Sequence, residues 1–171
     1  MSNIITFSKI RFWITVVSIV FNTTAGWGKE VYPEVRIPLL KDLSADLKLS
    51  QDSGRPVMLV FSAEHCFYCG RLKENIIKPM LRSGDYDHRV IIRTLEIDDY
   101  SNIKGSDGNE TTTSALANHY KVRVTPTVIL LGPDGTEVAE RQLGINNEDY
   151  YGAYLDKEIE AATKTIASGK R

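Results

Sequence analysis

The chain has 171 residues, of which 42% are hydrophobic and 25% are charged, as in an ordinary globular protein. A chain of this length is expected to form one folded domain. Its net charge of −1 gives no electrostatic basis for binding nucleic acid, which usually requires a strongly basic face. We therefore expect no nucleic-acid partner.

The N-terminus has the layout of a secretory signal peptide. Lys9 and Arg11 precede an apolar run at 12–21, and small, polar residues follow it up to Ala25. We predict a signal peptide over 1–25, cleaved after about Ala25, and hence export to an oxidising compartment. The alternative is an uncleaved membrane anchor, but the run is shorter than the ~20 apolar residues that span a bilayer.

The remainder of the chain predicts alternating helices and strands. Helices are indicated by apolar residues three and four apart, and strands by continuous or alternating apolar runs. In chain order we expect an extended lead-in at 26–38, a helix at 39–51, a strand at 56–61, a helix from Cys66 interrupted at Pro79, a strand at 90–97, a surface loop at 98–109, a helix at 114–120 capped by Thr113 or Ser114, strands at 127–131 and 137–143, and a last helix capped by Asn147. This order predicts an α/β fold with a mixed central β-sheet flanked by helices on both faces.

The only two cysteines, Cys66 and Cys69, lie three residues apart where the first buried strand gives way to a helix. At a helix N-terminus, unpaired backbone N–H groups and the helix dipole favour a thiolate. A second cysteine one turn later can attack the mixed disulfide that the first one forms. The pattern predicts thiol-disulfide exchange, with Cys66 as the nucleophile and Cys69 as the resolving cysteine.

Two other uses of the pair are open from the residues alone. A purely structural disulfide is one, although a bridge between residues three apart restrains little of the unfolded chain. Binding of Cu(I) by the two cysteines and His65 is the other, since thiolates are soft ligands. A structural zinc site is disfavoured because no second Cys or His pair stands at ligand spacing. We expect neither a metal nor a cofactor.

From about Leu39 to the C-terminus, the chain resembles the thioredoxin family. The resemblance rests on Cys66-x-x-Cys69 after a strand, a later Val124-Thr125-Pro126-Thr127, a Gly132-Pro133-Asp134-Gly135 hairpin and a terminal amphipathic helix. It implies that 39–171 form a thioredoxin fold and, with the export signal, that the protein is a periplasmic thiol-disulfide oxidoreductase. A redox-inactive adaptor on the same fold is a further alternative.

The resemblance also implies which residues surround the cysteines. Thr125 and Pro126 would form a cis peptide bond against the pair and contact the substrate; an ordinary trans proline is the alternative. From the residues themselves, Phe67 and Tyr68 are candidates for an apolar rim that recognises partner chains, with local packing as the alternative. His65 and Glu64 are candidates for tuning the thiol pKa of the pair. Glu64 is considered for this role because the buried aspartate of thioredoxin is replaced here by Val60.

The direction of electron flow stays open, because Phe67-Tyr68 between the cysteines differs from the Gly-Pro of thioredoxin and the intervening residues tune the redox potential. We favour reduction. The expected partners are protein disulfide or dithiol substrates, with a membrane thiol-electron donor for a reductase or a disulfide oxidase system for an oxidase.

Overall fold

The computed structural model describes residues 34–169. The predicted signal peptide, its cleavage site and most of the extended lead-in lie outside the described residues. Within 34–169, none of the helices combines the length and the apolar character needed to cross a membrane.

The first helix, α1, is Leu43–Ser53, so the prediction of a helix from residue 39 is wrong at its start. Asp42 has an extended backbone, and its carboxylate accepts a hydrogen bond from the Ala45 N–H at 3.0 Å, which fixes the first turn. Before that cap, the chain pairs with a strand, because the Leu40 N–H donates to the Thr94 carbonyl. The helix ends at Gly54, whose φ of 72° suits a glycine.

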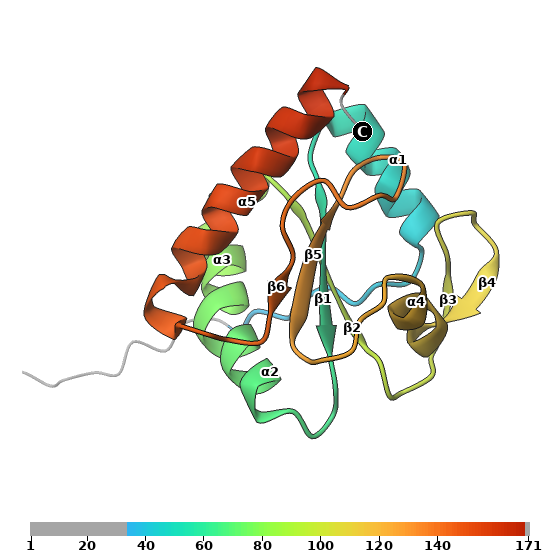
Figure 1. Ribbon diagram of the computed structural model, residues 1–171. Coiled ribbons are helices and arrows are strands. Elements are labelled where there is room, and N and C mark those ends of the chain that lie inside the picture. Colours follow the sequence, from blue (N-terminus) through green and yellow to red (C-terminus); the bar gives the residue numbers. More distant parts are fainter. Residues whose placement is uncertain (1–33, 170–171) are drawn as a thin grey trace, which may run out of the picture. The chain divides into compact units, whose positions relative to one another are not determined.

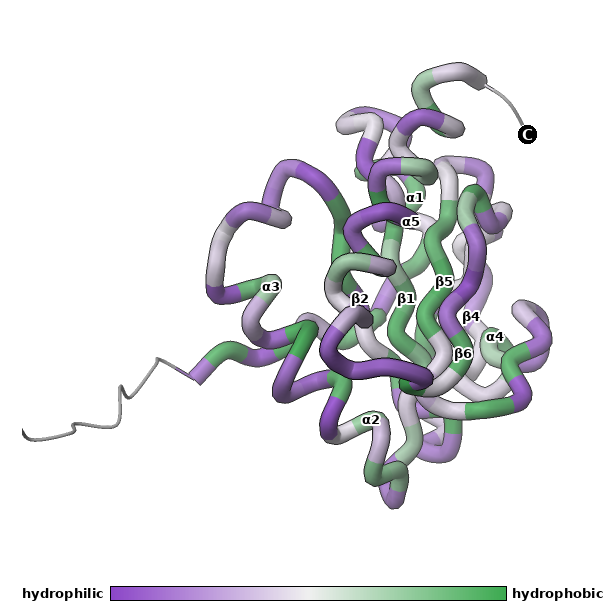
Figure 2. The backbone as a smooth tube through the Cα atoms, turned by 60° about the vertical axis from the view of Figure 1, so that its left-hand side comes forward, coloured by the Kyte–Doolittle hydropathy of each residue, from purple (hydrophilic) through white to green (hydrophobic). Residues whose placement is uncertain are grey.

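The central sheet has the strand order β2-β1-β5-β6. Its strands are β1 (Val57–Ser62), β2 (Ile91–Glu96), β5 (Thr127–Leu131) and β6 (Gln142–Leu143). Strand β1 pairs parallel with β2 and antiparallel with β5, and all its residues are buried. The colouring of Figure 2 places the most hydrophobic backbone along these inner strands. The predicted mixed sheet is therefore confirmed, with the strand before the cysteines at its centre.

A single helical stretch follows Cys66, in three parts: α2 (Phe67–Leu72), a π-helical segment η1 (Lys73–Ile77) and α3 (Lys78–Ser83). Pro79 lies in the first turn of α3 and has no N–H to donate. The Lys78 N–H bonds to the carbonyl of Lys73, five residues back, so the regular ladder is interrupted just before the proline. The interruption expected at Pro79 is confirmed.

Two segments differ from their predictions. The expected surface loop at 98–109 contains part of a small antiparallel hairpin of β3 (Asn102–Lys104) and β4 (Glu110–Thr112). Its apolar anchor is the buried Ile103, set among polar residues that hid the alternation. The expected strand 137–143 reduces to β6, with one bridge between Glu137 and Leu131, because the Glu140 N–H is taken by the carboxylate of Glu158.

Two further helices complete the fold: α4 (Thr113–His119) and α5 (Glu148–Ser168). Thr112 caps α4, one residue before the predicted caps, since the hydroxyl of Thr113 donates to Asp99 instead. Asn147 occupies the N-cap position of α5, but its side chain makes no capping bond.

The helices cover both faces of the sheet (Figure 1). Helices α1 and α4 pack on one face, through Leu43, Leu47, Leu116 and Tyr120 against Phe61 and Ile129. The α2–α3 stretch and α5 pack on the other face, through Leu72, Ile76, Leu155 and Ile159 against Met58, Val60 and Val128. Each face therefore has its own apolar core, and the cysteines belong to the second face.

Candidate active site

Cys66 and Cys69 form a disulfide at the start of α2, with their Cα atoms 5.2 Å apart. Cys66 is the N-cap residue, and its Sγ lies 3.2 Å from the Cys69 N–H, which donates to it. Cys66 is half-buried and Cys69 is only 2% exposed. A partner sulfur can therefore reach Cys66 but not Cys69, which is the accessibility that a nucleophilic and a resolving cysteine require.

The two residues between the cysteines are exposed aromatics. Phe67 is 72% exposed and Tyr68 is 54% exposed, and their rings meet edge to face at 5.5 Å. The guanidinium of Arg71 lies 5.9 Å from the centre of the Phe67 ring. Two exposed aromatic side chains therefore lie next to the disulfide, and their role in contacting a substrate stays a prediction.

Thr125 and Pro126 lie at the same end of the sheet as the cysteines. The Thr125–Pro126 peptide bond is cis, and Thr127, the first residue of β5, pairs with Phe61 near the end of β1. Pro126 is buried and Thr125 is half-buried. The register therefore brings this segment to the end of β1 from which the cysteine loop departs.

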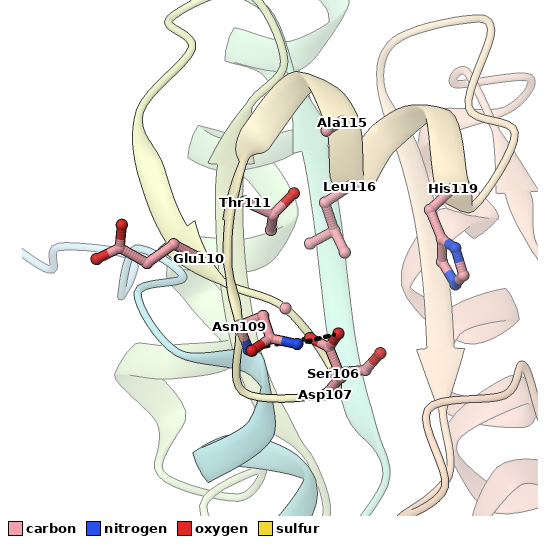
Figure 3. Close-up of a pocket in the computed structure, with 9 residues that line it drawn as sticks. Ser106, Asp107, Asn109, Glu110, Thr111, Ala115, Leu116 and His119 are labelled. Atoms are coloured by element: carbon pink, nitrogen blue, oxygen red, sulfur yellow. Dashed lines mark hydrogen bonds between the residues drawn. The ribbon is translucent and has the colours of Figure 1, made fainter.

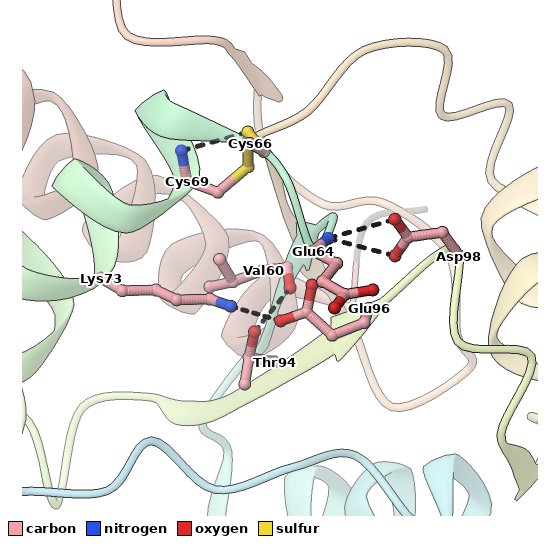
Figure 4. A network of polar contacts seen from close by, with 8 residues as sticks. All are labelled: Val60, Glu64, Cys66, Cys69, Lys73, Thr94, Glu96 and Asp98. Atoms are coloured by element: carbon pink, nitrogen blue, oxygen red, sulfur yellow. Dashed lines mark hydrogen bonds and ion pairs between the residues drawn. A yellow bond between two sulfur atoms is a disulfide. The ribbon is translucent and has the colours of Figure 1, made fainter.

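A cavity of about 430 Å³ lies beside the disulfide. Its lining includes both cysteines and five charged residues: Glu64, Lys73, Glu96, Asp98 and Asp99. Figure 4 shows Lys73 of the helical stretch and Glu96 of β2 pointing toward each other, with an ion pair between Lys73 Nζ and Glu96 Oε1. The disulfide is therefore flanked by an open cavity whose wall contains charged side chains.

Glu96 was not identified from the sequence. Lys73 follows Cys69 by four residues, so helical spacing alone places both on one side of the helix. Glu96 lines the cavity because it pairs with Ser62 in the parallel register of β1 and β2, and side chains of paired residues project from the same face of a sheet. That register cannot be read from either strand by itself.

The residues predicted to tune the pair lie at the rim. The side chains of Glu64 and His65 are exposed, and the Glu64 N–H donates to the carboxylate of Asp98 at 3.1 and 3.3 Å. Val60 has an apolar side chain, so no carboxylate is present at this position. Its backbone carbonyl accepts a hydrogen bond from the hydroxyl of Thr94 at 3.1 Å. Glu64 thus contributes to the mouth of the cavity, and its tuning role stays a prediction.

A second hollow of about 300 Å³ lies between the β3–β4 hairpin and α4. Figure 3 shows Asp107 and Asn109 of its wall, which bond to each other and so fix the hairpin turn. None of the predicted site residues lines it. Across residues 34–169, no three or more His, Cys, Asp or Glu side chains gather where they could hold a metal ion.

A strand that enters a helix at an accessible–buried Cys-x-x-Cys disulfide, beside a neighbouring strand that starts at a cis proline, is the arrangement of a thiol-disulfide oxidoreductase with a thioredoxin fold. The model of the family described as thioredoxin-like domain matches residues 43–159. The chain belongs to this thioredoxin-like family, which confirms the resemblance drawn from its sequence.

Solved structures agree on the fold. A thioredoxin from Thermus thermophilus is 24% identical, with a TM-score of 0.54, and the match covers 80% of this chain and 95% of that one. The DsbH oxidoreductase is 14% identical, with a TM-score of 0.56, covering 80% and 94%. The thioredoxin NaTrxh from Nicotiana alata is 20% identical, with a TM-score of 0.50, covering 74% and 98%. The search of curated proteins gave no match.

Proposed function

We propose that this thiol-disulfide oxidoreductase works in the bacterial periplasm and exchanges disulfides with protein substrates, mainly as a reductase. The observation that carries the exchange chemistry is the Cys66–Cys69 disulfide, with one half-exposed and one buried sulfur. The observation that supports export is the basic, apolar and small-residue order of residues 1–25.

In the reductive direction, the Cys66 thiolate attacks one sulfur of a substrate disulfide. A bond forms between Cys66 and that sulfur, and the other substrate sulfur leaves as a thiolate that takes a proton from solvent. Cys69 then loses its proton and attacks Cys66 Sγ, which forms the Cys66–Cys69 disulfide and releases the second substrate thiolate. The substrate has gained two electrons and the cysteine pair has lost them. The same steps in reverse donate the disulfide to a substrate dithiol.

A reductase in an oxidising compartment needs its own source of electrons, because the common thiol reductants are cytosolic. We therefore propose a membrane thiol-electron donor as the partner that re-reduces the pair. A disulfide oxidase system would take that place if the protein ran as an oxidase. The exposed Phe67 and Tyr68 offer apolar contact area to a protein substrate, and proteins of this family act on protein disulfides.

The reduction potential of the pair tests the direction. The full chain is equilibrated in glutathione buffers of graded poise, and its free thiols are trapped and counted. A reduction potential of about −270 mV, the value typical of thioredoxin, would support a reductase. A reduction potential of about −120 mV would make the protein a disulfide donor. A pair that did not cycle at all would overturn the exchange mechanism and leave Cu(I) binding as the function to test.

Substrates and location are tested together in a bacterial cell that expresses the full chain. C69S should accumulate mixed disulfides with protein partners, because the resolving thiol is gone, while the matched variant C66S should accumulate none. The N-terminal sequence of the recovered protein should begin close to Gly26. Retention of the whole chain in the cytosol would contradict the proposed location, and equal trapping by both variants would contradict the assigned roles.

A further inference from the structure

Two polar atoms at the edge of the active-site cavity are buried without a hydrogen-bond partner. They are Oε2 of Glu96 and Oγ of Ser62, and within the described residues only the Tyr151 hydroxyl shares this condition. Proteins leave few buried polar atoms unpaired, so two such atoms on paired residues of β1 and β2 indicate a specific use. Both residues line the same cavity as the cysteines.

The ion pair with Lys73 leaves this oxygen available. Lys73 Nζ bonds to the other carboxylate oxygen, Oε1, and Lys73 follows Cys69 by four residues on the same helical stretch. The lysine therefore holds the carboxylate beside the helix that carries Cys69 (Figure 4), while Oε2 is buried and makes no bond to a protein group. A cavity of about 430 Å³ with several charged side chains in its wall has room for water, which can connect the Glu96 carboxylate with the buried thiol of Cys69.

The other carboxylates of the cavity are less suited to accept a proton from Cys69. Asp98 is bonded to the Glu64 N–H, and the side chain of Glu64 is exposed. Asp99 accepts from the Ser101 N–H and from the hydroxyl of Thr113, and these bonds hold the pKa of the Asp99 carboxyl below its usual range. Glu96 is the one whose buried oxygen has no partner.

We infer that Glu96, held by Lys73, accepts the proton of the Cys69 thiol through water beside Ser62. The inference rests on the proposed exchange and assigns its proton step. In the mixed disulfide, the Cys69 S–H bond breaks and its proton passes to Glu96 Oε2, while the sulfur keeps the electron pair. That thiolate attacks Cys66 Sγ, the substrate thiolate leaves, and Glu96 returns its proton to solvent. In the opposite direction Glu96 gives the proton to Cys69 as it leaves.

The two chemical steps can be separated with 5,5′-dithiobis(2-nitrobenzoate). The reduced full chain releases one coloured thiolate when Cys66 attacks the reagent and a second when Cys69 resolves the mixed disulfide, and stopped-flow absorbance follows both. We expect E96Q to leave the first release unchanged and to slow the second by at least about tenfold, which is below the usual effect of a positioned acid–base group because water also accepts a thiol proton. The slowing should be greatest at acidic pH, where hydroxide is scarce.

E110Q is the matched control, because it removes an exposed carboxylate of β4 that lines the second hollow and not the cavity of the cysteines, and both releases should match the wild type. E96D keeps the charge but withdraws the acceptor by one methylene, so we expect its second release to be slowed less than that of E96Q, with the pH profile retained. Urea unfolding verifies that each variant is folded. If E96Q did not fold, an unchanged second release in E96D would overturn the inference.

An unchanged second release in folded E96Q, or an equal slowing in E110Q, would likewise overturn the assignment of Glu96 while the proposed exchange stood. The absence of a first release in the wild-type chain would overturn the proposed exchange itself. The first and second releases therefore distinguish the failure of one proposal from the failure of the other.

Discussion

The two faces of the central sheet treat buried polar groups differently. On the α1 face, Arg93 of β2 binds both carboxylate oxygens of Asp46, at 2.9 and 2.6 Å, and its remaining donor group reaches the Ile92 carbonyl. On the α2 face, Lys73 binds one oxygen of Glu96 and leaves the other buried and unpaired. Arg93 and Glu96 lie three residues apart on one strand, yet only the first pair is saturated.

The tyrosines repeat this difference. Tyr120, on the α1 face, donates its hydroxyl to the Gly135 carbonyl at 3.0 Å, while the hydroxyl of Tyr151, on the α2 face, is buried without a partner. All three unpaired buried side-chain atoms of the described residues belong to the face or the strand end that carries the cysteines. The comparison teaches that the unpaired buried side-chain atoms of the described residues gather on the face of the sheet that carries the cysteines, and that two of them line the cavity beside the disulfide.

The largest loss of stability is expected from Asp46→Ala. The substitution leaves the Arg93 guanidinium partly buried without its carboxylate, which we expect to lower the free energy of unfolding by about 2 to 3 kcal/mol, less than for a fully buried pair because water reaches Arg93. Urea unfolding measures the loss. The rates of both thiolate releases should stay unchanged, and a slowed second release would contradict the separation of the two faces.

The tyrosine hydroxyls should give smaller effects of opposite sign. Tyr120→Phe removes a bonded hydroxyl and should cost about 1 kcal/mol in the free energy of unfolding. Tyr151→Phe removes a buried hydroxyl without a partner and should be neutral or stabilising by up to about 1 kcal/mol. Parallel urea unfolding at neutral pH measures both. Equal losses in the two variants would show that the Tyr151 hydroxyl has a partner that matters.

At alkaline pH, Tyr120 and Tyr151 should affect the free energy of unfolding in the same direction. Burial raises the pKa of Tyr120 to about 12, with a further contribution from Glu137, and burial also raises the pKa of Tyr151. Because an unfolded tyrosine ionises near about pH 10, the unfolded state releases protons that the folded state keeps, so stability is complete below that pH and falls as pH rises above it. Either Phe variant should make this fall less steep, measured by urea midpoints at stepped alkaline pH. A fall as steep as in the wild type in Tyr120→Phe would contradict the assignment.

How much of this the sequence predicts depends on whether a feature is local. The buried strand before Cys66, the helix interrupted at Pro79 and the oxidised pair itself follow from residues that are neighbours in the chain, and the structure contains them. Whole-fold placement came from the resemblance, which the family match confirms. The hairpin of β3 and β4 escaped because its single buried residue, Ile103, gives no periodic pattern.

The polar side of the site was not predicted, because it depends on register between strands. Glu64 is the candidate carboxylate from the sequence because it is close to Cys66, and the structure places its exposed side chain at the mouth of the cavity. Glu96 is 27 residues from Cys69 in the sequence, and only its pairing with Ser62 brings it to the cavity. Pairing of distant strands decides which charges share a cavity, and no pattern within one segment contains that information.

The smallest change in stability is expected from replacing the second ion pair as a whole. Lys73→Met combined with Glu96→Leu exchanges both partners for apolar groups of similar size, which usually leaves stability unchanged or raises it. Because the pair is only partly buried and one oxygen is unpaired, we expect the free energy of unfolding to change by less than about 1 kcal/mol. The second thiolate release should nevertheless be slowed as in E96Q. A loss comparable with that of Asp46→Ala would mean that both faces use their ion pairs for stability, and the functional contrast between them would fail.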